Sequence, residues 1–171
     1  MREIVRRSMR AILLDEHDQV LLIKRVEPGQ EPYWTAPGGG LEPTDSSLEA
    51  ALRRELREEL GAEAEQFSQV FLFSSPSGEG VSVQHFFSCR LTSVDENERS
   101  GPEFSDQSRG GYLLDRVPVD RIPEVDLKPD ALKDFIVSNA EALISAWCGV
   151  VARPGRDQAE RHTLVGELST G

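Results

Sequence analysis

Three glutamates follow a run of glycines at a spacing that could build a metal site. Glu55, Glu58 and Glu59 lie within the stretch PGGGLEPTDSSLEAALRRELREELGA, residues 37–62. Residues three and four apart share one face of a helix, so these carboxylates can converge. Hard divalent cations such as Mg²⁺ prefer carboxylate oxygens. The spacing predicts a metal site or, alternatively, a charged helix face in solvent.

The helix that carries the glutamates has an apolar ridge. Its leucines recur every fourth residue, at Leu48, Leu52, Leu56 and Leu60. Glu55 and Glu59 lie beside this ridge, although a purely solvated face would lie opposite it. Ser46-x-x-Glu49 has the form of a capping box, which predicts that Ser46 is the N-cap and that the helix ends at Gly61.

The same stretch resembles the signature of the Nudix hydrolase superfamily, G-x5-E-x7-R-E-U-x-E-E-x-G-U, where U is a bulky aliphatic residue. Residues 54–62 match it except that the last position is the small Ala62. In the first half, counting from Gly39 places the acidic position at Asp45 with one extra residue before the arginine, and counting from Gly40 places Ser46 there. We favour Asp45 because it retains a carboxylate.

The resemblance implies an α/β fold, a Nudix-type α/β/α sandwich with a mixed β-sheet between helices. It also implies a site that binds Mg²⁺ or Mn²⁺, with the ligands Glu55, Glu58, Glu59 and the backbone of Gly39. Family members often recruit a further carboxylate from a later loop. The long acidic segment 92–109 offers Glu103 first and Asp106 second, although both could be plain solvated acids. The implied catalytic residues are Glu55, Glu58, Arg54 and Glu103, with Arg54 orienting a helix carboxylate.

Candidate substrate-binding residues precede the helix. Gly38, Gly39 and Gly40 permit close approach of backbone to a ligand, but no Walker motif or GxGxxG is present. Trp34 could stack on a nucleobase or anchor the loop as a core residue. Arg25 could contact phosphate or carry an ordinary charge at a strand end.

The remaining chain reads as strands and one further helix. Apolar runs predict strands at 9–14, 20–23, 65–73, 81–91 and 111–114, those at 9–14 and 20–23 being covered on both faces. His85 lies on the apolar face of the strand 81–91, as a hydrogen-bonded core residue or as part of the pocket. The spacing from Leu132 to Trp147 predicts one amphipathic helix. We expect one domain over 1–148 and a flexible tail over 149–171.

Composition narrows the class of protein. The 171 residues carry a formal net charge of −11, which argues against nonspecific binding of duplex nucleic acid. No apolar run has membrane-spanning length and no secretory signal is apparent, so we expect a cytoplasmic protein without membrane contact. Cys89 and Cys148 lack metal-site spacing.

Together these observations predict a metal-dependent pyrophosphohydrolase that acts on a small nucleotide. It would cleave the diphosphate linkage of a nucleoside diphosphate joined to another group, in a nucleoside triphosphate or a nucleotide sugar. The alternative is a non-catalytic Nudix-fold nucleotide-binding module. A third reading, a surface metal site that only stabilises the fold, is less compatible with the neighbouring glycines. A homodimer is compatible with the sequence.

Overall fold

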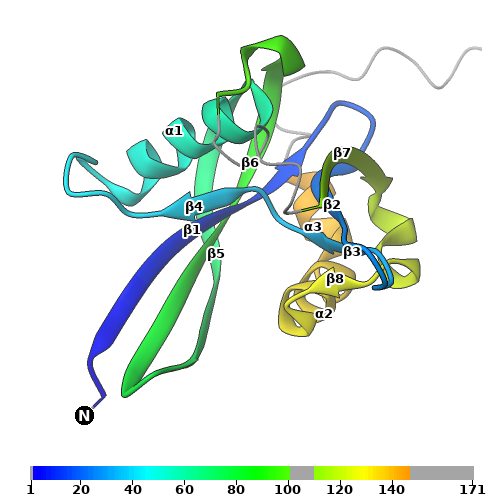
Figure 1. The fold of residues 1–171 in the computed structure, drawn as a ribbon. Coiled ribbons are helices and arrows are strands. Elements are labelled where there is room, and N and C mark those ends of the chain that lie inside the picture. Colours follow the sequence, from blue (N-terminus) through cyan, green and yellow to red (C-terminus); the bar gives the residue numbers. More distant parts are fainter. Residues whose placement is uncertain (1, 101–109, 147–171) are drawn as a thin grey trace, which may run out of the picture.

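The computed structural model describes residues 2–100 and 110–146. These residues contain one eight-stranded sheet with the strand order β5-β6-β1-β2-β3-β8, in which β4 also pairs with β1 and β7 with β2 (Figure 1). The strands are β1 (Ile4–Leu14), β2 (Gln19–Val26), β3 (Tyr33–Thr35), β4 (Gly38–Gly40), β5 (Ala62–Ser77), β6 (Gly80–Val94), β7 (Gly111–Pro118) and β8 (Leu127–Lys128). The α-helices are α1 (Leu48–Leu60), α2 (Asp130–Ser138) and α3 (Ala140–Ser145), and short 3₁₀ turns are η1 (Glu96–Glu98) and η4 (Val119–Glu124).

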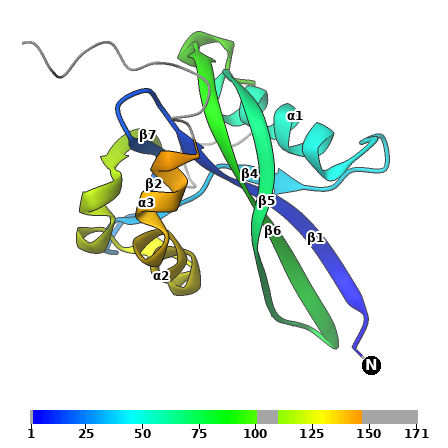
Figure 2. The ribbon, with the colours of Figure 1, turned by 180° about the vertical axis from the view of Figure 1, so that it is seen from behind.

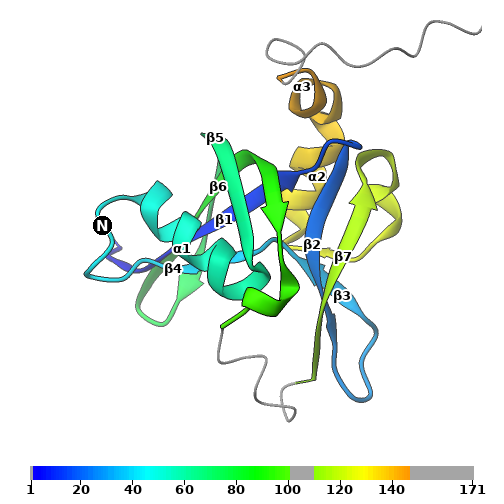
Figure 3. The same cartoon turned by 90° about the horizontal axis from the view of Figure 1, so that it is seen from above.

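The sheet is mixed and lies between helices. β1 runs parallel to β6, and β3 runs parallel to β8, whereas β2 is antiparallel to β1, β3 and β7. Figure 3 shows α1 on one face of the sheet and the α2–α3 pair on the other. This arrangement confirms the α/β/α sandwich.

Each face of the sheet has its own apolar core. The core under α1 includes Met9, Ala11, Leu13, Leu52 and Leu56. The core under α2 and α3 includes Ile12, Leu14, Phe86, Leu132 and Ile136. Neighbouring residues of β1 therefore point into opposite cores, which is why its C-terminal half is apolar without alternation.

Helix α1 begins one residue later than predicted. Ser47 is the N-cap, with extended backbone, and its Oγ accepts a hydrogen bond from the Ala50 N–H at 3.0 Å. No capping box forms, because the third helical position after Ser47 is Ala50, which has no side-chain acceptor, and Glu49 pairs with Arg53. The predicted end is confirmed: Gly61 adopts a left-handed φ of 61° and its N–H donates to the Arg57 carbonyl at 2.8 Å.

The single C-terminal helix expected from periodicity is two helices. Asn139 interrupts the helical backbone, and its side-chain amide donates to the Phe135 carbonyl at 2.8 Å. Asparagine competes in this way with backbone hydrogen bonds, which periodicity cannot register. Trp147 and the predicted tail 149–171 lie outside the described residues.

The N-terminal half of β1 and the β5–β6 hairpin extend away from the helices, as the rear view in Figure 2 shows. The hairpin turns at Gly78 and Glu79. In the described ranges, no helix has the length and apolarity needed to cross a membrane.

Candidate active site

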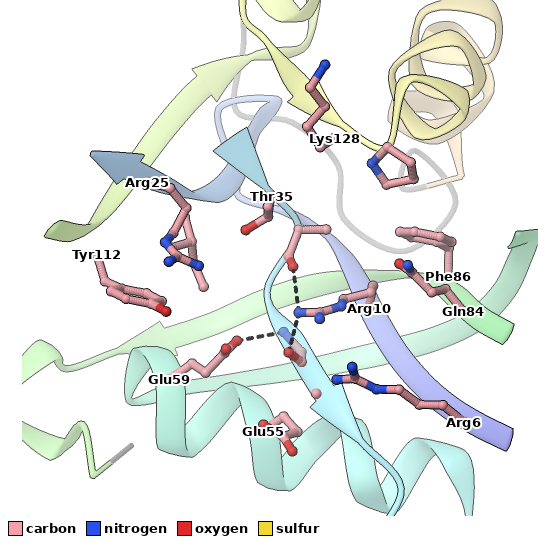
Figure 4. Close-up of a pocket in the computed structure, with 15 residues that line it drawn as sticks. Arg6, Arg10, Arg25, Thr35, Glu55, Glu59, Gln84, Phe86, Tyr112 and Lys128 are labelled. Atoms are coloured by element: carbon pink, nitrogen blue, oxygen red, sulfur yellow. Dashed lines mark hydrogen bonds between the residues drawn. The ribbon is translucent and has the colours of Figure 1, made fainter. Parts of the chain in front are cut away.

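A pocket of about 520 Å³ opens between α1, β4 and the central strands (Figure 4). Two carboxylates and four cationic side chains line it, together with polar, apolar and glycine residues. The charged residues are Glu55, Glu59, Arg6, Arg10, Arg25 and Lys128, and the others include Thr35, Gly38, Gly39, Gln84, Phe86 and Tyr112. Glycines of β4 and glutamates of α1 thus line the same cavity.

Strand β4 lies directly against the helix carboxylates. The Gly38 N–H donates to Glu59 Oε2 at 2.6 Å, and Glu59 is only 9% exposed. A Cβ on Gly39 would lie 2.2 Å from the Glu55 carboxyl carbon. A Cβ on Gly38, whose φ is +134°, would lie 2.1 Å from the Met9 carbonyl oxygen. Close backbone approach therefore requires glycine at both positions.

Arg54 orients the glutamates from outside the pocket. Its Nη1 lies 2.9 Å from Glu55 Oε1 and 3.3 Å from Glu58 Oε2, and its Nη2 donates to the Gly40 carbonyl at 3.1 Å. Charge-assisted bonds of this kind hold carboxylates in a defined geometry. Glu58 is thus paired with Arg54 and is not part of the pocket wall.

Asp45 provides the remaining support for Arg54. Its two carboxylate oxygens accept from Arg54 Nε at 3.1 Å and Nη2 at 3.0 Å. The hydrogen bond from Arg54 is the main reason that the pKa of Asp45 is lowered. Ser46, the alternative in the motif alignment, is exposed. Despite the extra residue in the motif, the Asp45 carboxylate therefore pairs with Arg54.

Burial shifts the pKa values of Glu55 and Arg10, and neighbouring charges oppose both shifts. Desolvation raises the pKa of Glu55, and the hydrogen bond from Arg54 opposes that rise. Desolvation lowers the pKa of Arg10, and the nearby Glu59 charge opposes that change. Opposite charges inside the pocket therefore favour each other's ionised forms.

The donor set fits a hard divalent cation. Glu55, Glu59 and the backbone at Gly39 offer oxygen ligands at the pocket, and the gap under Gly39 is filled by a carboxylate. Within residues 2–100 and 110–146, no three Asp, Glu, His or Cys side chains gather into a metal-binding group. Mg²⁺ commonly uses one or two carboxylates and completes its shell with water and substrate phosphates, so two carboxylates are sufficient.

Arg25 and Tyr112 form one end of the pocket. The Arg25 guanidinium carbon lies 3.8 Å from the centre of the Tyr112 ring, and its Nη2 is 3.4 Å from Glu27 Oε1. Figure 4 shows Arg10 between this pair and the Gln84–Phe86 side of the cavity. The pocket therefore has cationic groups on the side facing the glutamates.

The structure places several predicted residues elsewhere. Trp34 does not line the pocket; it packs on the core under α2, and its Nε1–H donates to Asp115 at 2.8 Å. This contact corresponds to the loop-anchor alternative. His85 is buried between Arg7 and Gln69, each at 3.2 Å, as a core histidine would be. Glu103 and Asp106 lie outside the described residues.

Sequence reasoning missed most of the cationic and polar lining residues. Arg6 and Arg10 lie two strand positions from Ser8 on the same side of β1, within a strand that becomes wholly apolar after Arg10. The available signal was Arg10, a charged residue between the apolar Met9 and Ala11 of a predicted strand. Gln84, Phe86, Tyr112 and Lys128 carry no comparable signal, because only the sheet register brings their strands together.

Comparison with known proteins agrees with this geometry. The chain is 36% identical over 81 residues to a Bacillus subtilis protein named "Putative 8-oxo-dGTP diphosphatase". That match covers 47% of this chain and half the length of the relative.

Two solved structures share the fold. A NUDIX hydrolase from Nitrosomonas europaea superposes with a TM-score of 0.61 at 19% identity, covering 80% of this chain and 88% of that one. The NUDIX domain of Shewanella oneidensis NrtR, in complex with ADP ribose, also gives 0.61, at 20% identity, covering 84% and 90%.

The family profile described as NUDIX domain matches residues 5–133. This range contains β4, α1 and the four cationic residues that line the pocket. This match spans most of the chain, and the chain therefore belongs to the NUDIX domain family.

Proposed function

We propose that the protein is a metal-dependent pyrophosphohydrolase. Its substrate is a nucleoside diphosphate linked to another group, in a nucleoside triphosphate or a nucleotide sugar. One observation carries this proposal: Glu55 and Glu59 share a pocket with Arg6, Arg10 and Arg25. Carboxylates suited to a cation and guanidinium groups suited to phosphate lie in one cavity.

The chain's own residues have distinct parts in this reaction. Glu55 and Glu59, with the backbone at Gly39, hold Mg²⁺ or Mn²⁺, which when bound neutralises phosphoryl oxygens and acidifies water. Arg54 keeps the Glu55 carboxylate aimed at the pocket. The general base is one of the helix glutamates or a loop acid, for which Glu103 is the first candidate, because a carboxylate near the cation can accept the proton of a water molecule.

The names of the relatives suggest which substrates to test first. The Bacillus subtilis relative is named for 8-oxo-dGTP, and the NrtR domain binds ADP ribose. Both ligands contain a diphosphate flanked by a nucleoside. In this pocket the Arg25–Tyr112 pair offers a flat surface for a base or sugar.

A substrate panel tests the proposal. Nucleoside triphosphates, 8-oxo-dGTP, ADP-ribose and nucleotide sugars would each be incubated with Mg²⁺ or Mn²⁺, and the products identified by mass. We expect hydrolysis of a P–O bond in the P–O–P linkage of the substrate. Glu59→Gln should lower the rate by more than about 100-fold, because changes even behind a metal ligand cost 10- to 100-fold.

Glu49→Gln is the matched control for that variant. Glu49 lies on the same helix but pairs with Arg53 and is not part of the pocket wall. It should retain full activity. Undiminished turnover by Glu59→Gln would remove Glu59 from the mechanism.

The second candidate function is a nucleotide-binding module without turnover. The pairing of Glu58 with Arg54 favours it, since the two helix carboxylates that remain at the pocket are both proposed ligands of the cation and neither is left to act as a base. Metal-dependent binding of a panel member with no product would establish the module and exclude the hydrolase. A homodimer and a cytoplasmic location stay predictions from the sequence.

A further inference from the structure

Arg10 occupies a position in the pocket that the metal-site hypothesis does not use. It lies in β1 directly opposite Gly38 of β4 in the antiparallel register. Its side chain lines the cavity between Glu59 on one side and Gln84 on the other (Figure 4). Arg10 lies between the fully buried Met9 and Ala11, so its charge needs polar partners.

One of the three guanidinium nitrogens of Arg10, Nη1, is bonded to the backbone at and just before β4. Nη1 donates to the Ala36 carbonyl at 3.3 Å and to the Gly38 carbonyl at short range. The N–H of the same Gly38 donates to Glu59 Oε2. Gly38 therefore links the two side chains, because its carbonyl accepts from Arg10 and its N–H donates to Glu59, a proposed metal ligand.

The other two nitrogens, Nε and Nη2, do not bond to β4. In the described part of the chain, the structure gives Arg10 Nε and Nη2 no hydrogen bond. A guanidinium group has five N–H donors in a planar fork, which matches the oxygens of a phosphate. The two bonds from Nη1 fix the plane of that fork before any ligand arrives.

We propose that Arg10 is a substrate-binding residue that donates from Nε and Nη2 to a phosphoryl oxygen while Nη1 stays bonded to the carbonyls of Ala36 and Gly38. This inference rests on the proposed function, because it names the group that receives the phosphate beside the metal ligands. Substrate and metal affinity are then coupled through Arg10. Its charge attracts phosphate and repels a cation from Glu55 and Glu59.

This coupling predicts opposite changes in two affinities. Removing the Arg10 charge should weaken phosphate binding, and it should strengthen binding of Mg²⁺ alone, because a like charge beside the cation is lost. A purely structural arginine would behave differently. Loss of β4 geometry would weaken both affinities together, since Gly38 and Gly39 lie on that strand.

Isothermal titration calorimetry on the full chain measures both affinities. The probes are Mg²⁺ alone and then imidodiphosphate at saturating Mg²⁺, whose P–N–P linkage resists hydrolysis. For Arg10→Gln we expect imidodiphosphate affinity to fall by about 10- to 100-fold, the loss typical of a charged hydrogen bond. The Mg²⁺ affinity should rise several-fold. Arg10→Lys keeps the charge, so its Mg²⁺ affinity should match the wild type while imidodiphosphate binds more weakly.

Arg7→Gln is the control, because Arg7 lies on the same strand but bonds to His85 on the opposite face. It should change neither affinity. A joint fall of both affinities in Arg10→Gln and Arg10→Lys, or no change in either, would overturn the proposal. The readout is independent of turnover, so inactivity of the wild type on every panel member would refute the hydrolase and leave this inference standing.

Discussion

Replacing Gly39 by alanine should disable the site without unfolding the protein. A Cβ at this position would lie 2.2, 2.3 and 2.4 Å from the three carboxyl atoms of Glu55. The backbone itself accepts alanine, because Gly39 has no left-handed φ. The entire effect therefore falls on the carboxylate that the helix presents to the pocket.

The magnitude follows from the contact distance. Real Cβ atoms essentially never come closer than 3.0 Å to another heavy atom, so the Glu55 carboxyl carbon must retreat by at least 0.8 Å (3.0 − 2.2). That movement also disturbs its 2.9 Å contact with Arg54. Misplacement of a reacting group by about 1 Å can cost about 100-fold in rate. Overpacking of this kind costs about 1–3 kcal/mol of stability, too little to unfold a typical domain.

Gly40→Ala is the matched comparison. No heavy atom lies within 4 Å of a Cβ built at Gly40, and its φ is also not left-handed. Steady-state hydrolysis of the best panel substrate, calorimetric Mg²⁺ binding and thermal unfolding would be measured for both variants. We expect about a 100-fold loss of rate and weaker Mg²⁺ binding in Gly39→Ala only. Equal activity in the two variants would show that the Glu55 position does not matter for the reaction.

Three further variants test single features of the structure. Asp45→Asn should lower activity about 10- to 100-fold, because it weakens the pairing that holds Arg54. Ser46→Ala should leave activity unchanged. A larger loss in Ser46→Ala than in Asp45→Asn would instead support the alignment that places Ser46 at the acidic position of the motif. Trp34→Phe should lower the unfolding free energy by about 1–3 kcal/mol with KM unchanged, and a raised KM would instead support stacking on substrate. Burial raises the pKa of Cys89 to about 12. Its folded pKa is thus above the unfolded value, so its stabilising contribution is complete below about pH 9 and is lost as pH rises towards 12. In urea titrations Cys89→Ala should remove about 1.4 kcal/mol per pH unit from the alkaline slope, and an unchanged slope would show that the thiol is not buried.

The local sequence determined the elements of the site. Leucines every four residues set which face of α1 is buried, and this placed Glu55 and Glu59 at the border of the core. The glycines before the helix predicted a close approach of the backbone to other groups, although the strand β4 that they form was not predicted. These properties depend on neighbours within a few turns of chain, so periodicity and residue type were sufficient to predict them.

Only the tertiary structure decided what surrounds the glutamates. The parallel pairing of β1 with β6 and the antiparallel pairing of β2 with β7 bring Arg10, Gln84 and Tyr112 to the cavity from three strands that are distant from one another in the sequence. In the folded structure Trp34 donates a hydrogen bond to Asp115, and Glu58 pairs with Arg54. Local patterns record which residues a helix or strand buries, but the partner across a sheet depends on register, which no short stretch of sequence encodes.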